Sequence, residues 1–285
     1  MLLIFVALLI LAALGQDHRA AAAPAVAKQM FTLDFSNNSV DDQYIGCRKD
    51  MMNLVEKEYL MKEINNSPEF NEAWQKGVKN ATKPENNLKE NHSIAMYVYT
   101  LHVPKLYSVL NFAVHDGMQN YTNKTFEWYS LHFLLTEAIQ ILKETQKTCY
   151  NVTYRGTNFT FGKNVLNTEI RFGTFASSTL NRTIANDFGS ASCFEIRTCE
   201  GANLTKYSRF PHQKEVLIPP YETFNVTAVK TRGVQPDLWC DTVFVLNSTG
   251  KRSHMNCALF GSENHVADSN VLLILTLFNV YLLTS

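Results

Sequence analysis

The sequence lacks the motifs that mark several large classes of protein. None of its 12 glycines forms a Gly-x-Gly-x-x-Gly pattern, so a Rossmann dinucleotide site is not expected. None of its six cysteines forms a Cys-x-x-Cys pair, so neither a zinc site nor a thioredoxin-like redox motif is expected. Its 26 Lys and Arg are balanced by 26 Asp and Glu and form no basic stripe. We therefore expect neither nucleic acid as a partner nor a metal as a cofactor.

The N-terminal apolar run lacks the length of a membrane span. Residues 2–14 are apolar, whereas a helix that spans a bilayer needs about 20 such residues. The run is typical of a secretory signal peptide, and a buried core helix, the alternative, has no cap or periodicity to support it. Ala13-Leu14-Gly15 offers a cleavage site before Gln16, and the alanines of residues 20–23 offer a later one. We predict a signal peptide over residues 1–15, extending to about residue 23 with the later site.

The C-terminal apolar run lacks the basic residues that follow a stop-transfer segment. Residues 271–285 are apolar, a polar spacer (residues 263–270) precedes them, and the small pair Gly261-Ser262 precedes the spacer. This is the pattern of a GPI-anchor signal, so residues 261–285 are predicted to be removed. The mature protein would then be anchored by lipid to the extracellular face of the plasma membrane. A short transmembrane anchor and a secreted form are the alternatives.

Two further features agree with an extracellular protein. Asn-x-Ser/Thr sequons are abundant, which indicates a heavily glycosylated surface. They begin at Asn37, Asn65, Asn80, Asn91, Asn120, Asn123, Asn151, Asn158, Asn181, Asn203, Asn225 and Asn247. The six cysteines are an even number, which in a secreted protein favours disulfides over free thiols. Spacing alone does not decide how the cysteines pair.

Between the two ends, residues 34–260 are long enough for one sizeable domain. Its first half has apolar residues at helical spacing, and its second half alternates like strands. We expect helices over residues 50–60, 94–101, 106–113 and 129–143, with Ser130 capping the last, and a polar loop over residues 76–93. We expect strands over residues 149–154, 168–175, 193–199, 215–218, 223–229 and 242–246. Helices first and strands second predict an α+β fold.

Three polar positions stand at the ends of these predicted strands. Arg155 follows one strand, Ser177 follows the next, and Glu215 begins a third. Taken singly, each has an ordinary explanation: an exposed ion pair for the arginine, a turn or cap for the serine, and a solvated strand end for the glutamate. Their order along the chain and the residues around them are more specific than any one of them.

This order and its surroundings resemble the vertebrate cell-surface mono-ADP-ribosyltransferases, the ecto-ADP-ribosyltransferases, whose signature is Arg, then Ser, then Glu-x-Glu. The likeness extends over residues 35–257. It rests on the blocks Asp41-Asp42-Gln43-Tyr44-Ile45-Gly46-Cys47, Cys149-Tyr150, Tyr154-Arg155-Gly156, Arg171-Phe172-Gly173-Thr174-Phe175-Ala176-Ser177-Ser178 and Lys214-Glu215-Val216-Leu217-Ile218-Pro219-Pro220. The resemblance implies a helical lobe and a strand-rich lobe around an NAD cleft, and an enzyme that transfers ADP-ribose to a protein acceptor or to water.

The resemblance also implies how the cysteines pair. Cys47 is expected to pair with Cys257, and Cys149 with Cys199, as in the family. Cys193 and Cys240 are then left to pair with each other. NAD is implied as the substrate, and the acceptors implied are proteins at the cell surface.

The resemblance assigns a set of site residues to this sequence. Those implied are Arg155, Ser177 and Glu215 for catalysis and Tyr99, Arg155, Gly156, Phe172, Phe175 and Ser177 for NAD binding. Arg155 can hold the phosphates with its planar fork of donors, and Gly156 lets the backbone approach the nicotinamide amide. Cleavage of the nicotinamide–ribose bond gives an oxocarbenium-like cation, which a carboxylate at Glu215 stabilises. The two phenylalanines are expected near the nicotinamide, and Tyr99 on the adenosine side.

Gln213 stands where the family has the first Glu of Glu-x-Glu, the residue that positions and deprotonates an arginine acceptor. An amide can hydrogen-bond a guanidinium, but it carries no charge and takes no proton. Loss of a general base typically costs about 10²–10⁴-fold in rate, and Lys214 further disfavours a cationic acceptor. His212 is a poor substitute, because neighbours on a strand point to opposite faces. We therefore expect weak transfer to arginine, with water or another acceptor group taking the ADP-ribose.

Two alternatives stay open. In the first, the protein is a catalytically silent surface glycoprotein that uses the fold for recognition or adhesion. In the second, it is a full arginine transferase that recruits another carboxylate, with Glu222 as the nearest candidate in the sequence. Retention of Arg155, Ser177 and Glu215 argues against a complete loss of NAD chemistry.

Overall fold

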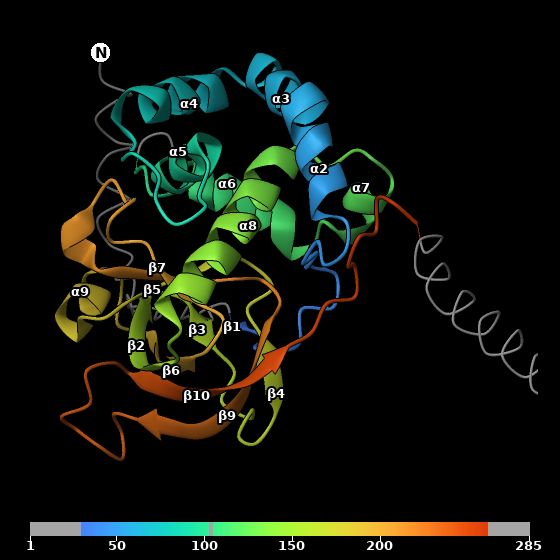
Figure 1. Cartoon of the computed structure of the whole chain (residues 1–285). Coiled ribbons are helices and arrows are strands. Elements are labelled where there is room, and N and C mark those ends of the chain that lie inside the picture. The colour runs from blue at the N-terminus through green and yellow to red at the C-terminus, as the bar shows by residue number, and fades with distance from the viewer. Residues whose placement is uncertain (1–29, 103–104, 262–285) are drawn as a thin grey trace, which may run out of the picture.

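The computed structural model describes residues 30–102 and 105–261 (Figure 1). The predicted signal peptide lies outside these ranges, as does the predicted anchor signal apart from Gly261. The helices are α2 (Arg48–Leu54), the π-helix η1 (Val55–Tyr59), α3 (Leu60–Asn66), α4 (Pro68–Asn80), α5 (Glu90–Tyr99), α6 (Leu106–His115), α7 (Met118–Thr122), α8 (Tyr129–Gln146), α9 (Arg182–Asp187) and the 3-10 turn η2 (Pro211–Gln213). The strands are β1 (Met30–Phe31), β2 (Tyr150–Thr157), β3 (Thr160–Phe161), β4 (Glu169–Arg171), β5 (Ala176–Thr179), β6 (Ser192–Thr198), β7 (Ala202–Asn203), β8 (Glu215–Ile218), β9 (Glu222–Thr231) and β10 (Thr242–Lys251).

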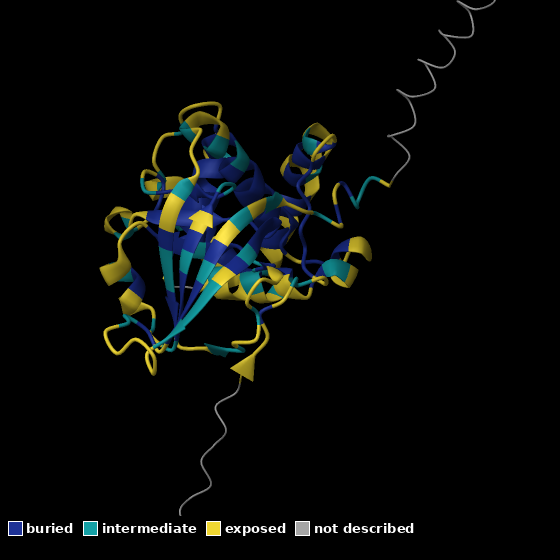
Figure 2. Cartoon of the chain, turned by 90° about the horizontal axis from the view of Figure 1, so that it is seen from below, coloured by how far each residue is buried: buried dark blue, intermediate teal, exposed yellow. Residues whose placement is uncertain are grey.

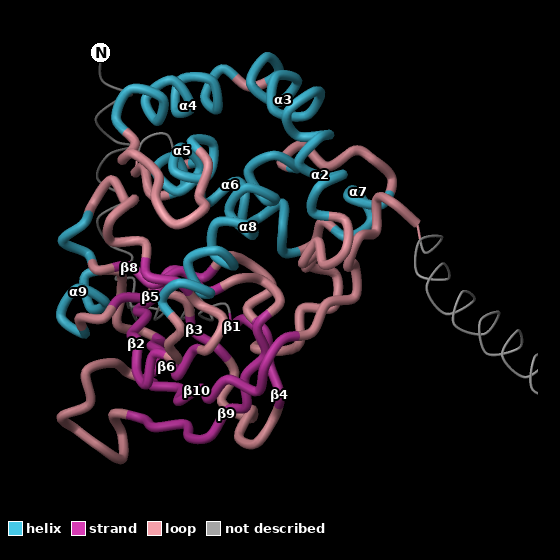
Figure 3. Tube along the Cα trace, viewed as in Figure 1, coloured by secondary structure: helices cyan, strands magenta, loops and turns pink. Residues whose placement is uncertain are grey.

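Helices and strands gather in two separate lobes, which confirms the α+β prediction. Figure 3 shows α2 to α8 on one side of the molecule and the strands on the other. Eight strands form one sheet in the order β4-β9-β10-β6-β2-β5-β8-β7. Its neighbours are antiparallel except for β10 and β6, which run parallel. Figure 2 shows buried residues filling the interior under the sheet, with exposed residues on the turns.

Helix α8 is the centre of the helical lobe. The apolar stripe that the sequence predicts is buried, and it consists of Leu131, Leu134, Leu135, Ala138, Ile139 and Leu142. The predicted cap is wrong: Trp128 is the N-cap residue, and Ser130 lies in the first turn. The N–H of Ser130 instead donates to the buried carboxyl of Glu63 at 3.1 Å. Burial raises the pKa of Glu63 to about 8, although the hydrogen bonds from Ser130 lower it.

The predicted loop over residues 76–93 is too long at both ends. Residues 76–80 continue α4, whose N-terminus is capped by Ser67 and opened by Pro68. The buried face of α4, which ends at Gly77, packs on the helical core and holds this polar stretch in the helix. Because α5 begins at Glu90, the loop covers only residues 81–89.

The predicted strand over residues 168–175 is too long, because only residues 169–171 are strand and the next strand begins after residue 175. β4 ends at Arg171 and pairs with β9 at one edge of the sheet, whereas β5 begins at Ala176 and lies between β2 and β8. Gly173 lies between them with φ +62°, a backbone conformation that ends an extended run. Ser177 is therefore on a strand of its own, inside the sheet rather than at the end of the preceding strand.

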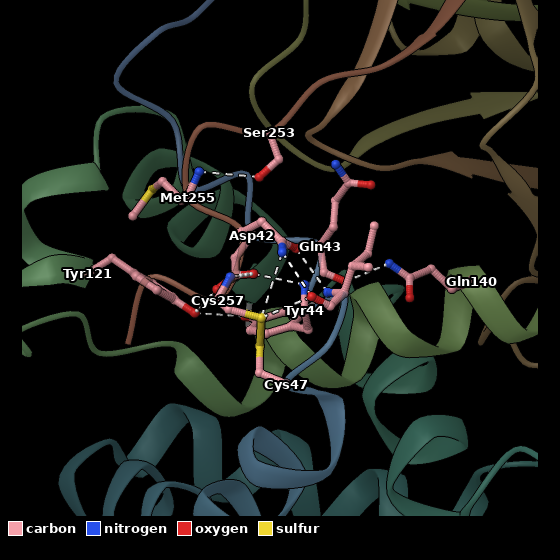
Figure 4. The surroundings of a disulfide bond; sticks show 11 residues. Asp42, Gln43, Tyr44, Cys47, Tyr121, Gln140, Ser253, Met255 and Cys257 are labelled. Atoms are coloured by element: carbon pink, nitrogen blue, oxygen red, sulfur yellow. Dashed lines mark hydrogen bonds between the residues drawn. A yellow bond between two sulfur atoms is a disulfide. The ribbon is translucent and has the colours of Figure 1, made fainter. Parts of the chain in front are cut away.

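The three predicted disulfides are all present in the described residues. They join Cys47 to Cys257, Cys149 to Cys199, and Cys193 to Cys240. Figure 4 shows the first, which joins the start of the helical lobe to the C-terminal end of the described chain. Beside it, Asp42 accepts hydrogen bonds from the N–H groups of Tyr44 and Cys257, at 2.8 and 2.9 Å, and from the hydroxyl of Tyr121 at 2.9 Å. Burial raises the pKa of Asp42 to about 6, and the two backbone hydrogen bonds lower it.

A buried ion pair between Asp41 and Arg171 reinforces the same junction. Asp41 also accepts hydrogen bonds from the N–H groups of His254 and Met255, both at 3.0 Å. Arg171 donates from Nε to the carbonyl oxygen of Phe35 at 3.0 Å. The pair therefore ties the N-terminal segment, the edge strand β4 and the C-terminal segment into one unit.

Candidate active site

A cavity of about 990 Å³ is lined by residues of both lobes. The lining includes every predicted site residue: Tyr99, Arg155, Gly156, Phe172, Phe175, Ser177, Gln213 and Glu215. Tyr99 comes from α5, whereas the others come from the sheet and its connections. The structure thus brings together eight residues spread over more than a hundred positions of the sequence, although their individual roles stay predictions.

Arg155, Ser177 and Glu215 come from three adjacent strands of the sheet, β2, β5 and β8. β5 pairs antiparallel with both of its neighbours. The side chain of Arg155 reaches across to β5, where its Nη1 donates to the carbonyl oxygen of Ser177 at 2.7 Å. A guanidinium has five donors, so this bond orients the group while leaving it the capacity to bind an anion.

Glu215 opens β8 with a carboxyl group that is removed from water, since 7% of the residue is exposed. Burial raises the pKa of this carboxyl above its ordinary value of 4.5, while a hydrogen bond from the Ser177 side chain and the charge of Arg155 lower it. In a site of low dielectric constant, the ionised carboxylate interacts strongly with positive charge that develops beside it. The arrangement is suited to stabilising a cation in the cavity.

Gln213 lies in a turn rather than on a strand. It ends the 3-10 turn η2, and Lys214 follows in the left-handed conformation, with φ 47°. Thr179 on β5 holds this turn, because its hydroxyl donates to the carbonyl oxygen of Gln213 at 2.6 Å. The strand argument against His212 is therefore wrong in its geometry. His212 is nevertheless exposed, with its ring edge-on to Phe210, and it does not line the cavity.

Glu222 is not available as a substitute carboxylate, so the choice of this residue as the candidate is wrong. The residue is fully buried at the start of β9 and does not line the cavity. Its carboxyl accepts hydrogen bonds from the Thr198 and Ser248 hydroxyls at 2.6 and 2.7 Å, and from the N–H groups of Cys199 and Glu200 at 2.7 and 3.1 Å. These four donors account for the carboxyl as a structural group of the sheet.

Asn111 on α6 is a cavity residue that the sequence reasoning missed. Its Oδ1 accepts from the N–H of Phe175 at 3.1 Å, and its Nδ2 donates to the carbonyl oxygen of Phe175 at 3.0 Å. The hydroxyl of Tyr99 donates to the same carbonyl at 2.8 Å. The two side chains fix the backbone of Phe175, two residues before Ser177. The available signal was a lone amide in the apolar stretch of residues 106–114.

Phe172 and Phe175 line the cavity but are also parts of the core. Phe175 is 1% exposed and packs edge-on to Tyr99 and His132. Phe172 is half-buried and packs edge-on to Phe194, with ring centroids 5.5 Å apart. Both residues therefore have a packing role in the core in addition to the predicted position near the nicotinamide.

The packing of the fold requires glycine at position 156, independently of any ligand. A Cβ at this position would lie 2.2 Å from the carbonyl oxygen of Ala185 and 2.4 Å from that of Gly189. Both oxygens belong to the backbone in and directly after α9, so neither can move aside cheaply. Glycine is what allows α9 to pack directly on β2.

Over residues 30–102 and 105–261, no three or more His, Cys, Asp or Glu side chains are grouped so that they could hold a metal ion. Over the same residues, no helix combines the length and the apolar character needed to span a membrane.

The fold recurs in known proteins. A crystal structure of the eukaryotic mono-ADP-ribosyltransferase ART2.2 matches with a TM-score of 0.67 and 28% sequence identity, over 81% of this chain and 100% of that chain. Structures of two variants of ART2.2, one in complex with NADH and one in complex with NAD, match with TM-scores of 0.66 and 0.65.

Comparison of the sequence with known proteins agrees with these structural matches. Ecto-ADP-ribosyltransferase 5 of Rattus norvegicus is 36% identical over 79% of this chain and 75% of its own length. GPI-linked NAD(P)(+)–arginine ADP-ribosyltransferase 1 of Mus musculus is 33% identical over 79% of this chain and 72% of its own length. The family model of the NAD:arginine ADP-ribosyltransferases matches residues 33–246. The chain therefore belongs to the NAD:arginine ADP-ribosyltransferase family.

Proposed function

We propose that this protein binds NAD in the cavity, breaks the nicotinamide–ribose bond and transfers ADP-ribose to a protein acceptor or to water. The observation that carries the proposal is the placement of Arg155, Ser177 and Glu215 on three adjacent strands around one cavity. The NAD and NADH complexes of ART2.2, which shares this fold, support NAD as the substrate.

The chemistry asks little of the protein beyond charge and position. The bond between ribose C1′ and the nicotinamide nitrogen breaks, and nicotinamide leaves with the electron pair. The cation left on the ribose lies beside the Glu215 carboxylate, while Arg155 holds the phosphates and the Ser177 side chain orients the carboxylate. A lone pair of the acceptor then attacks C1′, and the proton of the acceptor passes to solvent.

The acceptor is where this protein departs from its arginine-modifying relatives. Residues 209–214, which we call the acceptor-side loop, carry Gln213 at the cavity instead of a carboxylate. Gln213 offers no charge to a guanidinium, and Glu222 is fully used within the sheet. Transfer to arginine is therefore weak, and water or a group other than arginine receives most of the ADP-ribose.

The test is NAD turnover by the purified protein. Glu215→Gln removes the charge at nearly constant size and should lower NAD cleavage by about 10²–10³-fold, as loss of one electrostatic group at a transition state does. NAD should still bind to this variant in calorimetry, because Arg155 is intact. Glu127→Gln, at an exposed position of the helical lobe, is the matched control and should behave as the parent. Turnover that survives Glu215→Gln contradicts the assignment.

A second substitution tests the acceptor. Gln213→Glu restores a carboxylate at the cavity and should raise transfer to a small guanidino acceptor by at least about tenfold, within the usual contribution of a general base. Efficient arginine transfer by the parent protein would contradict the proposal, as would an unchanged rate in a Gln213→Glu variant that still cleaves NAD.

The silent-glycoprotein alternative predicts a different result. A module that keeps the fold for adhesion alone has no reason to bind the dinucleotide. Calorimetry with NAD separates the two, because absence of binding to a folded parent protein would favour the silent module. The retained strand positions of Arg155, Ser177 and Glu215 favour the enzyme.

We further propose that the mature protein is attached to the extracellular face of the plasma membrane by a GPI anchor. The names of the relatives, ecto-enzymes and one GPI-linked enzyme, support this location. The pattern of residues 261–285 supports the anchor. Phosphatidylinositol-specific phospholipase C should release the protein from intact cells, whereas a retained transmembrane segment would leave it in place.

A further inference from the structure

The acceptor-side loop carries three exposed basic side chains and no acidic ones. Arg209, His212 and Lys214 are exposed. Residues 201–214 contain no Asp or Glu, and the next residue, Glu215, is buried inside the cavity. The formal charge of the whole chain is zero, so the excess at this loop is a local asymmetry.

The loop is built around one aromatic ring. His102, in the segment just after α5, stacks on Phe210 with ring centroids 4.2 Å apart. The guanidinium carbon of Arg209 lies 5.4 Å from the centre of the same ring. The N–H of Arg209 donates to the Thr100 hydroxyl at 2.9 Å, which fastens the loop to the end of α5. These contacts fix Arg209 and the Phe210 ring beside the end of α5.

A neighbouring segment contributes one further basic side chain. The N–H of Leu180 donates to the carbonyl oxygen of Lys214 at 3.2 Å, and the exposed Arg182 follows at the start of α9. Figure 1 shows the orange turn of residues 211–213 beside α9. The carboxylate of Glu85 forms an ion pair with Lys206, so it does not neutralise the basic side chains of the loop. Asp187 lies at the far end of α9.

We propose that the acceptor-side loop docks an acidic segment of the acceptor protein. This rests on the proposed function, because the loop borders the cavity through Gln213, which lines it together with His102. Exposed cations beside the reacting position attract a segment rich in Asp and Glu and repel one rich in Arg and Lys. The loop therefore disfavours an arginine-rich acceptor, and Gln213, which lacks a charge, disfavours the same acceptor. Protein is favoured over nucleic acid because the cations form a compact cluster and not a stripe along an extended groove.

A direct binding experiment tests the docking without requiring turnover. A short fluorescein-labelled peptide rich in Glu, and the same peptide with Gln in place of Glu, are titrated with the purified protein by fluorescence anisotropy. The Glu peptide should bind more tightly, and its Kd should rise with salt. The double variant Arg209→Gln/Lys214→Asn should bind the Glu peptide about fivefold more weakly, within the range of two exposed charge contacts. Asn suits the left-handed backbone at position 214.

The control removes the same charge elsewhere. Lys49→Gln/Lys57→Gln neutralises two exposed lysines of the helical lobe and should leave peptide binding unchanged. NAD cleavage should be unaffected in this control variant, since neither lysine lines the cavity. Equal binding of the two peptides, or an unchanged Kd in the loop variant, overturns the proposal. Tighter binding of a short RNA duplex than of the Glu peptide also overturns it, in favour of a nucleic acid site.

The two proposals fail in different ways. A protein that selects the Glu peptide through the loop but leaves NAD intact contradicts the proposed function and not the docking. A protein that cleaves NAD and shows no preference between the peptides contradicts the docking alone.

Discussion

Glu215 and Glu222 are both buried carboxyl groups, on strands that follow each other in the chain, and burial raises the pKa of both. Their surroundings separate them. Glu222 accepts four hydrogen bonds from the protein and has no access to the cavity. Glu215 lines the cavity, where the Ser177 side chain and the charge of Arg155 lower its pKa against the effect of burial. Glu215 therefore keeps the capacity to interact with a group in the cavity, as its proposed role requires, whereas the hydrogen-bonding capacity of Glu222 is used within the sheet.

The pH dependence of NAD cleavage should report Glu215. In the proposed mechanism the ionised carboxylate is the active form. Its pKa is raised above 4.5, so the rate should fall as the pH drops through a value higher than that. Ser177→Ala removes a hydrogen bond that lowers the pKa, so the acidic limb should move to higher pH. The measurement is kcat/KM for NAD from acidic to neutral pH. A limb at or below pH 4.5, or one that Ser177→Ala leaves in place, would argue against this role.

At this scale the sequence predicts which residues meet, but not how the loop runs. Eight residues line the cavity as the resemblance implies. The 3-10 turn at Gln213 has no clear signal, because a left-handed backbone is expected at Gly or Asn and here falls on Lys214. Asn111 was missed for a similar reason. Its two bonds to the Phe175 backbone exist only after α6 has packed against the sheet.

Among the elements, the contact between α9 and β2 depends on one glycine. Gly156→Ala places a methyl group against backbone oxygens of residues 185 and 189, so either α9 or β2 must shift. We expect a loss of about 1–3 kcal/mol in the free energy of unfolding, with a weaker affinity for NAD, because Arg155 is next to the disturbed position. Urea unfolding and NAD calorimetry measure the two effects.

A glycine in open space provides the control for that substitution. Gly233 has nothing within 4 Å of an added Cβ, so Gly233→Ala should be close to neutral. Equal stabilities of the two variants would show that the packing of α9 on β2 tolerates a side chain.

The N-terminus of α8 should make stability depend on pH. The pKa of Glu63 is raised from 4.5 to about 8, so its contribution is complete below pH 4.5 and is lost as the pH rises through about 8. The side chain of the Glu63→Gln variant is uncharged at every pH. Relative to this variant, the parent should lose up to about 5 kcal/mol of unfolding free energy across that interval. Urea unfolding at several pH values tests it, with the exposed Glu58→Gln as control. Parallel curves for the parent and Glu63→Gln would contradict the expectation.

The elements themselves were largely predictable, and the errors have physical causes. Apolar periodicity predicted α8, and a short apolar run that ends at Pro219-Pro220 predicted β8, whose residues are all buried. The polar end of α4 could not be recognised as helix, because its stability comes from packing of the opposite face. The separation of β4 from β5 depends on sheet pairing between residues far apart in sequence, which local patterns do not contain.

For the whole molecule, the Asp41–Arg171 pair joins segments from the beginning, middle and end of the domain. Asp41→Asn leaves a buried guanidinium without its counter-charge and should cost about 3–5 kcal/mol. The loss should appear as a lower midpoint in thermal unfolding followed by circular dichroism. Asp50→Asn, at an exposed position of α2, removes an equal charge and should have little effect. A midpoint for Asp41→Asn that matches the control would show that the pair contributes little.

The disulfide between Cys47 and Cys257 closes most of the domain into a covalent ring. A protease that cuts the exposed turn after Arg232 opens the backbone, yet the two pieces stay one molecule, held by this bond and by that between Cys193 and Cys240. The nicked protein should migrate as one band on a gel without reductant and as two bands with it. All eight predicted cavity residues lie on the larger piece, and β10 on the smaller remains paired in the sheet. Proteolysis at this turn would therefore cut the backbone without releasing either fragment.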